Sequence, residues 1–151
     1  MNVFEPTLAA GLVGALRDFV NLVKLHPILV DFTAALVPVS VACDLAARVR
    51  GDESLRHTAW WTLLFATCIT PFTATAGWLF WMHDDNGVTG MTIHKWLGTS
   101  LVFLLIGLFF WRRDLRRRQQ WATGAYLVAG LVVVALLVVQ GALGGAQTYS
   151  G

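Results

Sequence analysis

Charged residues are scarce in this sequence. Asp, Glu, Lys and Arg together make up 13% of the 151 residues, whereas an ordinary soluble domain carries about 25%. Apolar residues reach 56%, and the formal net charge is only +2. No basic stripe with interleaved aromatic residues appears, so nucleic-acid binding is not expected. This composition favours a membrane protein, and the length favours a single domain.

Cysteine is sparse as well. The two cysteines, Cys43 and Cys68, both lie within apolar runs. Neither belongs to a CxxC or CxxCH motif, which excludes a zinc ribbon, a thioredoxin-type centre and covalently attached c-type haem. The sequence also lacks a hydrolase nucleophile elbow. We therefore expect no hydrolytic enzyme, and at most an electron-transfer subunit of an oxidoreductase complex.

Four long segments are predominantly apolar: residues 27–47, 58–82, 96–111 and 121–151. A helix that spans a bilayer needs about 20 residues. The third segment reaches that length only if it extends back through Lys95 and His94 to Thr92, which brings His94 inside the membrane boundary. The sequence therefore predicts an all-α fold, an integral membrane four-helix bundle over residues 26–151.

Residues 1–25 differ from the four spans. Apolar residues recur there at helical spacing, at Leu8, Leu12, Leu16, Phe19 and Val23. Polar residues occupy mostly the other faces, which is typical of an amphipathic helix that lies in the membrane interface. The basic residues follow the apolar stretch, so a cleaved signal peptide is less favoured.

Arginine distribution predicts the orientation of the spans. The connections after the first and third spans, residues 48–57 and 112–118, carry most of the arginines, whereas the middle connection at 83–95 does not. Basic connections stay in the cytoplasm. We therefore expect both termini and the middle connection to face outward.

Three of the four histidines fall at the outward-facing ends of the predicted spans: His26, His83 and His94. Imidazole at membrane depth ligates haem iron, binds copper or zinc, or relays protons. A haem b held by two histidines needs one imidazole on each side of the ring. His26 and His94 suit that role, because both precede apolar helices at a similar depth. His57, at the opposite end, is interpreted as a solvated terminal residue.

The outward-facing end also suggests a second kind of site. His83 begins a polar stretch with Asp84 and Asp85. Carboxylates and open positions suit a hydrated ion. An outer-face copper or zinc site from His26, His83 and His94 is therefore an alternative to haem.

Small and acidic residues lie near the histidines. Gly77 and Gly98 are predicted to bring helices close together or to leave room for a flat cofactor. Asp31 follows His26 by five residues, so it lies about 7.5 Å deeper in a helix. We expect Asp31 to face the bundle interior, where it would accept a proton from a quinol or form a hydrogen bond to a haem propionate or a histidine. The alternative is a polar residue bonded to Thr33 or to a neighbouring helix.

Two further residues, Asp44 and Arg48, have the spacing of an ion pair within one helix.

Four stretches, LHPILVDF, TAGWLFW, HKWLGTS and GALGG followed by TYSG, resemble the bacterial four-helix membrane domain known as domain of unknown function 2231. The resemblance runs from about Leu25 to Gly151. It implies a bacterial inner membrane location, cytochrome c, Rieske or quinoprotein-type partners, and b-type haem. Carried over by position, it supports His26 and His94. The family pattern has further histidines at the position of Asp31 and in the last helix, where this chain reads GALGGAQTY.

These observations predict a membrane electron-transfer subunit. It would bind haem b near the outer face and link an extracytoplasmic redox partner to quinone or to another subunit. Two alternatives remain open. One is a cofactor-free subunit that scaffolds or anchors a larger redox or photosynthetic complex. The other is the outer-face copper or zinc site.

Overall fold

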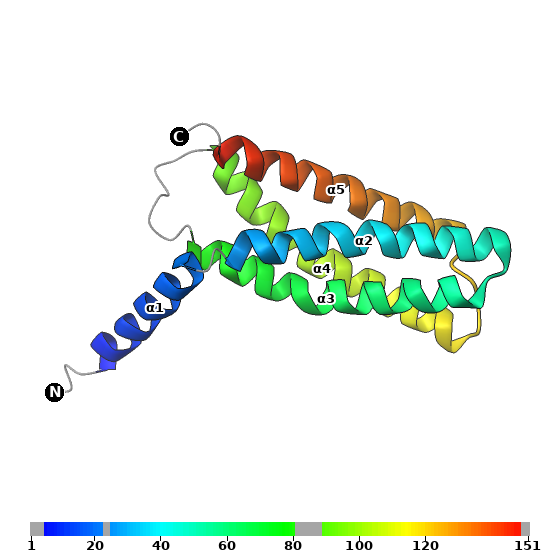
Figure 1. Cartoon of the computed structure of the whole chain (residues 1–151), viewed down its shortest axis with the longest axis horizontal. Helices are drawn as coiled ribbons and strands as arrows, with labels where there is room; N and C mark the ends of the chain where they lie inside the picture. Colours follow the sequence, from blue (N-terminus) through cyan, green and yellow to red (C-terminus); the bar gives the residue numbers. More distant parts are fainter. Residues whose placement is uncertain (1–4, 23–24, 81–88, 149–151) are drawn as a thin grey trace.

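The computed structural model describes residues 5–22, 25–80 and 89–148, and these ranges contain five helices and no strand (Figure 1). The helices are α1 (Glu5–Leu22), α2 (Leu25–Arg50), α3 (Glu53–Phe80), α4 (Thr89–Arg117) and α5 (Gly124–Thr148). The expected all-α fold is therefore confirmed. His83, Asp84 and Asp85 lie outside the described residues.

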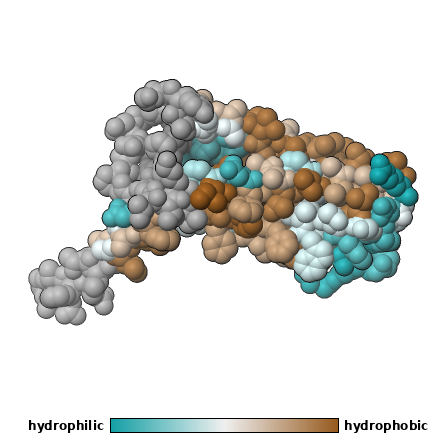
Figure 2. Space-filling view, viewed as in Figure 1, coloured by the Kyte–Doolittle hydropathy of each residue, from teal (hydrophilic) through white to brown (hydrophobic). Residues whose placement is uncertain are grey.

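Helices α2 to α5 are long and apolar enough to cross a membrane. The candidate spans are His26–Arg50, Glu53–Leu79, Thr92–Arg117 and Gly124–Ala146. The third of them begins where the sequence predicted, so His94 and Lys95 belong to the helix. Figure 2 shows apolar residues along the side of the bundle and hydrophilic residues at one end. This surface matches a bundle whose side chains face lipid.

The four long helices form a ring in which each packs against two neighbours. The packed pairs are α2 with α3, α3 with α4, α4 with α5, and α5 with α2. The diagonal pairs, α2 with α4 and α3 with α5, do not pack directly in the described part of the chain. Side chains on the bundle axis fill the centre, and the most buried include Val37, Leu63, Leu101, Leu105 and Tyr126. Two helix hairpins, α2–α3 and α4–α5, thus make up the bundle.

Helix α1 extends away from the bundle (Figure 1). Among the described helices it packs against α2 and α3 alone. Its apolar residues Leu12, Leu16 and Phe19 are exposed. The predicted helix is confirmed, and its place in the membrane interface stays a prediction.

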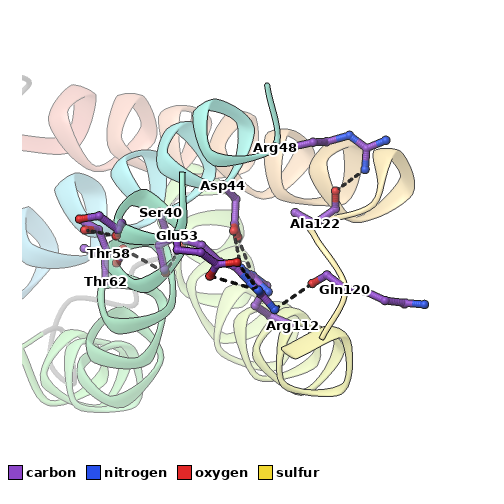
Figure 3. A network of polar contacts seen from close by, with 12 residues as sticks. Ser40, Asp44, Arg48, Glu53, Thr58, Thr62, Arg112, Gln120 and Ala122 are labelled. Carbon is purple, nitrogen blue, oxygen red and sulfur yellow. Dashed lines mark hydrogen bonds and ion pairs between the residues drawn. The ribbon is translucent and has the colours of Figure 1, made fainter. Parts of the chain in front are cut away.

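One end of the bundle carries the α2–α3 and α4–α5 connections and most of the arginines, and it is called the arginine end below. Asp44 is buried there and forms a two-pronged ion pair with Arg112 of α4 (Figure 3). Arg112 donates from Nε at 2.8 Å and from Nη2 at 2.6 Å to the two carboxylate oxygens. The expected pair with Arg48 is wrong. Asp44 faces the bundle axis, whereas Arg48 is exposed and donates to the Ala122 carbonyl at 2.6 Å.

Candidate functional site: a histidine pair across the bundle

His26 and His94 meet at the end of the bundle opposite the arginine end, which is called the histidine end below. His26 lies at the start of α2, and His94 lies in the second turn of α4. Their ring centroids are 6.4 Å apart, and the ring planes are nearly perpendicular at 86°. Because α2 and α4 are diagonal in the ring, the two side chains bridge the bundle axis. The structure thus brings together the two histidines that the sequence placed at one end, and their role as ligands stays a prediction.

The His26 ring is fixed against α3. Its Nδ1 lies 3.0 Å from the carbonyl oxygen of Thr73. One helical turn later, a Cβ atom added to Gly77 would come within 2.8 Å of the His26 ring. Because Gly77 has no side chain, the imidazole packs directly against the α3 backbone. A glycine that faces a histidine ring in this way is called a glycine seat below.

The His94 ring is held in the same way against α5. Its Nδ1 lies 3.2 Å from the carbonyl oxygen of Gln140. A Cβ added to Gly144, four residues further on, would come within 2.9 Å of the ring. Each hairpin therefore supplies one histidine from its first helix, and a carbonyl and a glycine from its second.

These contacts determine which ring nitrogen carries the proton. A carbonyl oxygen only accepts hydrogen bonds, so Nδ1 of both His26 and His94 must be the donor. In a neutral ring the lone pair is then on Nε2, the nitrogen available to a metal. A histidine that binds a metal commonly donates its other N–H to a carbonyl in this manner. Both rings therefore have the tautomer that a metal ligand needs, although the Nε2 of His94 is already in contact with the Gln140 amide at 3.3 Å.

Gln140 is the third polar member of the site. Its Nε2 amide donates to Nε2 of His94 at 3.3 Å and to the His94 carbonyl at 3.0 Å. Its Oε1 is buried and has no hydrogen-bond partner among the described residues. The absence of a side chain at Gly98 makes room for this amide, since a Cβ there would lie 2.9 Å from Gln140 Nε2. The unpaired oxygen leaves an acceptor free for a bound water or ligand.

The space enclosed at the pair is small. A cavity of about 30 Å³ lies there, which holds a water or two but no flat ring of porphyrin size. Its lining residues are His26, Ala74, Gly77, Trp78, His94, Lys95, Gly98, Thr99 and Gln140. Gly77 and Gly98 lie beside the histidines as predicted, but they accommodate the His26 ring and the Gln140 amide. The donor set thus suits a metal with two imidazole ligands, whereas the packing leaves no porphyrin-sized slot.

The other predicted site residues lie apart from the pair. Asp31 is exposed on α2 and does not line the cavity, so the expectation that it faces the bundle interior is wrong. It does not bond Thr33 either, because Thr33 contacts Leu29 and Thr70 instead. Within the described residues no group of three or more His, Cys, Asp or Glu is placed to hold a metal ion. The metal site that includes His83 depends on residues outside the described ranges.

Sequence reasoning missed the roles of Gln140 and Gly144. Gln140 is the one amide within the apolar stretch 124–146, and a lone polar residue in a span is a signal of function. Gly144 had no such signal, because glycines at 141, 144 and 145 look alike in sequence. The GxxxG spacing of Gly141 and Gly145 suggested packing, yet a Cβ at either would meet open space.

Comparison with known protein families identifies the family to which the chain belongs. A family model described as predicted membrane protein (DUF2231) matches residues 23–151. The chain belongs to this family. The suspected resemblance is therefore confirmed over α2 to α5, and α1 precedes the matched region. No curated protein and no solved structure matches the chain. The family description supplies membrane character, and the chemistry of the pair must be argued from the residues.

The glycine seat gives a direct test of the site geometry. Gly144→Ala should place a methyl group against the His94 ring and cost about 1–3 kcal/mol in unfolding free energy through overpacking. Gly141→Ala and Gly145→Ala are matched controls in the same helical turns, and both should be neutral or stabilising by up to about 1 kcal/mol. Unfolding of the purified chain in detergent measures all three. Equal stability of the three variants would contradict the seat.

Proposed function

We propose that this chain is a membrane subunit of an electron-transfer complex and that His26 and His94 would hold haem b after the helices around them move apart, because the present packing leaves no porphyrin-sized slot. The main support for the proposal is that the two hairpins hold their histidines in the same way. Two hairpins each present one imidazole with its Nδ1 bound to a carbonyl, and the two rings meet on the bundle axis.

Each residue of the site has a part in this proposal. His26 and His94 would hold the iron, and the Thr73 and Gln140 carbonyls would keep both rings in the ligating tautomer. When bound, haem b carries one electron at a time. Trp78 and Lys95 line the same cavity, and the Lys95 ammonium lies 5.2 Å from the Trp78 ring centroid. A cation held there favours an anionic group at the mouth of the site.

An exposed carboxylate supports the view that this chain is one subunit among several. Asp31 lies within the candidate span His26–Arg50 and is exposed on the surface of α2. A carboxylate that faces lipid is costly, and such residues normally face protein or water. A neighbouring subunit or a quinone head group would provide that environment. By the family resemblance we further propose the bacterial inner membrane and an extracytoplasmic redox partner. By the distribution of arginines we propose that the histidine end faces outward.

A second candidate function follows from the small cavity. The space of about 30 Å³ suits a bare ion better than a porphyrin. Copper and zinc both accept imidazole ligands. On this alternative, His26 and His94 bind one such ion and Gln140 lies beside it.

One set of measurements separates these functions. The full chain is purified from a membrane of a haem-producing host, and its oxidised and reduced spectra are recorded with its iron, copper and zinc content. Haem b gives reduced-minus-oxidised bands with one iron per chain. Bound copper or zinc without those bands favours the second candidate. A chain without metal or haem after growth with both would contradict the two proposals and favour a scaffolding subunit.

The role of Asp31 is tested separately. If Asp31 transfers a proton to or from a quinol, Asp31→Asn should slow quinone-linked turnover by about 100-fold or more. Membrane insertion should be preserved, because the amide is near-isosteric and uncharged. Asp114→Asn, at an exposed position of α4 near the arginine end, is the control and should leave turnover unchanged. Unchanged turnover in Asp31→Asn would restrict Asp31 to contact with a neighbouring subunit.

A further inference from the structure

The arginine end contains a second cavity, which is larger and more polar than the one at the histidine pair. Its volume is about 120 Å³, enough for several waters. Its lining residues are Glu53, Arg56, His57, Arg112, Arg116 and Gln119. They come from the first turns of α3, from the last turns of α4 and from the residues just after α4. Among the described residues, the lining thus combines three arginines with one glutamate and one histidine.

Arg112 lines this cavity and has one unsatisfied buried donor. The side chain is 1% exposed, and its Nε and Nη2 are both engaged by Asp44. The guanidinium is planar, so Nη1 lies on the side that does not face Asp44. This nitrogen is buried and finds no hydrogen-bond acceptor in the described ranges. A buried charged donor without a partner is costly, so an acceptor in the cavity would stabilise the fold.

The other two arginines are held in place by aromatic rings. The Arg56 guanidinium lies 5.2 Å from the Trp121 ring centroid, and that of Arg116 lies 4.8 Å from the Trp60 ring centroid. Arg56 also donates to the exposed Glu53 carboxylate at 2.9 Å. Stacking on a ring fixes a guanidinium plane without using its N–H groups. The arginines are thus oriented before any ligand binds.

The charges at the cavity sum to a net positive charge. Asp44 balances Arg112, and Glu53 balances Arg56. Arg116 has an aromatic contact and no carboxylate partner among the described residues. One positive charge therefore remains, together with the free donor of Arg112.

The backbone conformation at Gln119 suggests that its side chain has a role in the cavity. Gln119 has a φ of 55°, a conformation that usually selects glycine. Its neighbours form the hydrogen bonds of a helix-ending motif, from Gln119 N to Arg116 O and from Gln120 N to Leu115 O. Glycine would relieve strain of about 1 kcal/mol at this place. The glutamine contributes an amide to the cavity instead.

We infer that this cavity binds a phosphate group. Guanidinium forks match phosphate oxygens in geometry and charge, and the cavity offers Arg56, Arg112 and Arg116 from two helices together with the Gln119 amide. Its place at the end of four membrane spans, beside Trp60 and Trp121, puts it at the depth of lipid head groups. Basic pockets between membrane helices bind anionic head groups. A phosphodiester of an anionic phospholipid and a free phosphate share this chemistry, and the experiment below distinguishes them.

The test uses the full chain purified in a non-ionic detergent. Thermal unfolding is followed while inorganic phosphate replaces chloride at constant ionic strength. A parallel series adds phosphatidylglycerol or phosphatidylcholine to the micelles. A rise in unfolding temperature with phosphate identifies the free anion as sufficient. A rise with phosphatidylglycerol alone identifies the lipid. No rise in either series, or an equal rise with both lipids, overturns the inference.

Two variants separate this site from general surface charge. Arg116→Gln should raise the apparent dissociation constant of the effective ligand by about tenfold or more, the loss expected for one charge-assisted contact. Arg117→Gln removes the same charge one residue away, at an exposed position outside the cavity, and should leave the constant unchanged. Arg112→Lys keeps a cation beside Asp44 but lacks the free Nη1, so it should also weaken binding. Equal affinities in Arg116→Gln and Arg117→Gln would overturn the inference.

Discussion

Replacing Arg112 by methionine is expected to lower the free energy of unfolding by about 3–5 kcal/mol, the usual cost of removing one partner from a buried ion pair. Asp44 and Arg112 are each 1% exposed, and both guanidinium–carboxylate contacts are short. The pair joins α2 to α4, diagonal helices whose backbones do not approach closely in the described residues and which meet again through His26 and His94 at the other end. Without Arg112, the Asp44 carboxylate has no cation in direct contact among the described residues.

A control variant and a double variant test whether the loss of stability is specific to the buried ion pair. Arg118→Met removes an exposed ion pair with Asp114 from the end of the same helix, and it should cost about 0.5 kcal/mol or less. The double variant Asp44→Leu/Arg112→Met should recover most of the loss, because apolar residues can replace a buried ion pair at little cost. Unfolding in mixed detergent gives all three values. Similar losses in Arg112→Met and Arg118→Met would show that burial does not strengthen the Asp44 contact.

His94→Ala is expected to abolish the haem spectrum of the purified chain or, for the second candidate, its bound copper or zinc. The ring has no substitute, because within the described residues only His26 offers another imidazole at the histidine end. His26→Ala should have the same effect, since one imidazole remains on one side only. Because the two ligands act together, removal of either one should abolish binding and not merely halve it.

A matched histidine at the other end provides the control. His57→Ala changes an exposed residue at the arginine end and should leave the spectrum and the metal content unchanged. His83→Ala separates the two candidates, because haem bands should survive it whereas a copper or zinc site that includes His83 would not. Haem bands retained in His94→Ala would remove the pair from the proposal.

The spans and the meeting of His26 with His94 could be predicted because both depend on position along a helix. Length and hydropathy determine which helices cross a membrane. The connections then place the histidines at one end, whatever the packing. The extension of the third span to Thr92 followed from length alone, and α4 confirms it.

The partners of Asp44 and the direction of Asp31 could not be predicted, because they depend on which face of α2 meets the other helices. Local spacing favoured Arg48 for Asp44, yet tertiary packing placed Arg112 of α4 nearer. Asp31 is on the exposed face of the same helix. Helix α2 is only weakly amphipathic, so the usual sequence signal for the buried face is faint.

The diagonal position of the two histidines has a consequence for the order of assembly. Each hairpin, α2–α3 or α4–α5, has its own histidine, carbonyl and glycine, so each can insert with its ring already seated. In a two-stage view, insertion of the helices precedes their association. The pair exists only after the hairpins have associated. A group that binds both imidazoles would therefore bind only to bundles in which the two hairpins have associated. The fraction of chains that carry this group would then report the fraction of chains that is fully assembled.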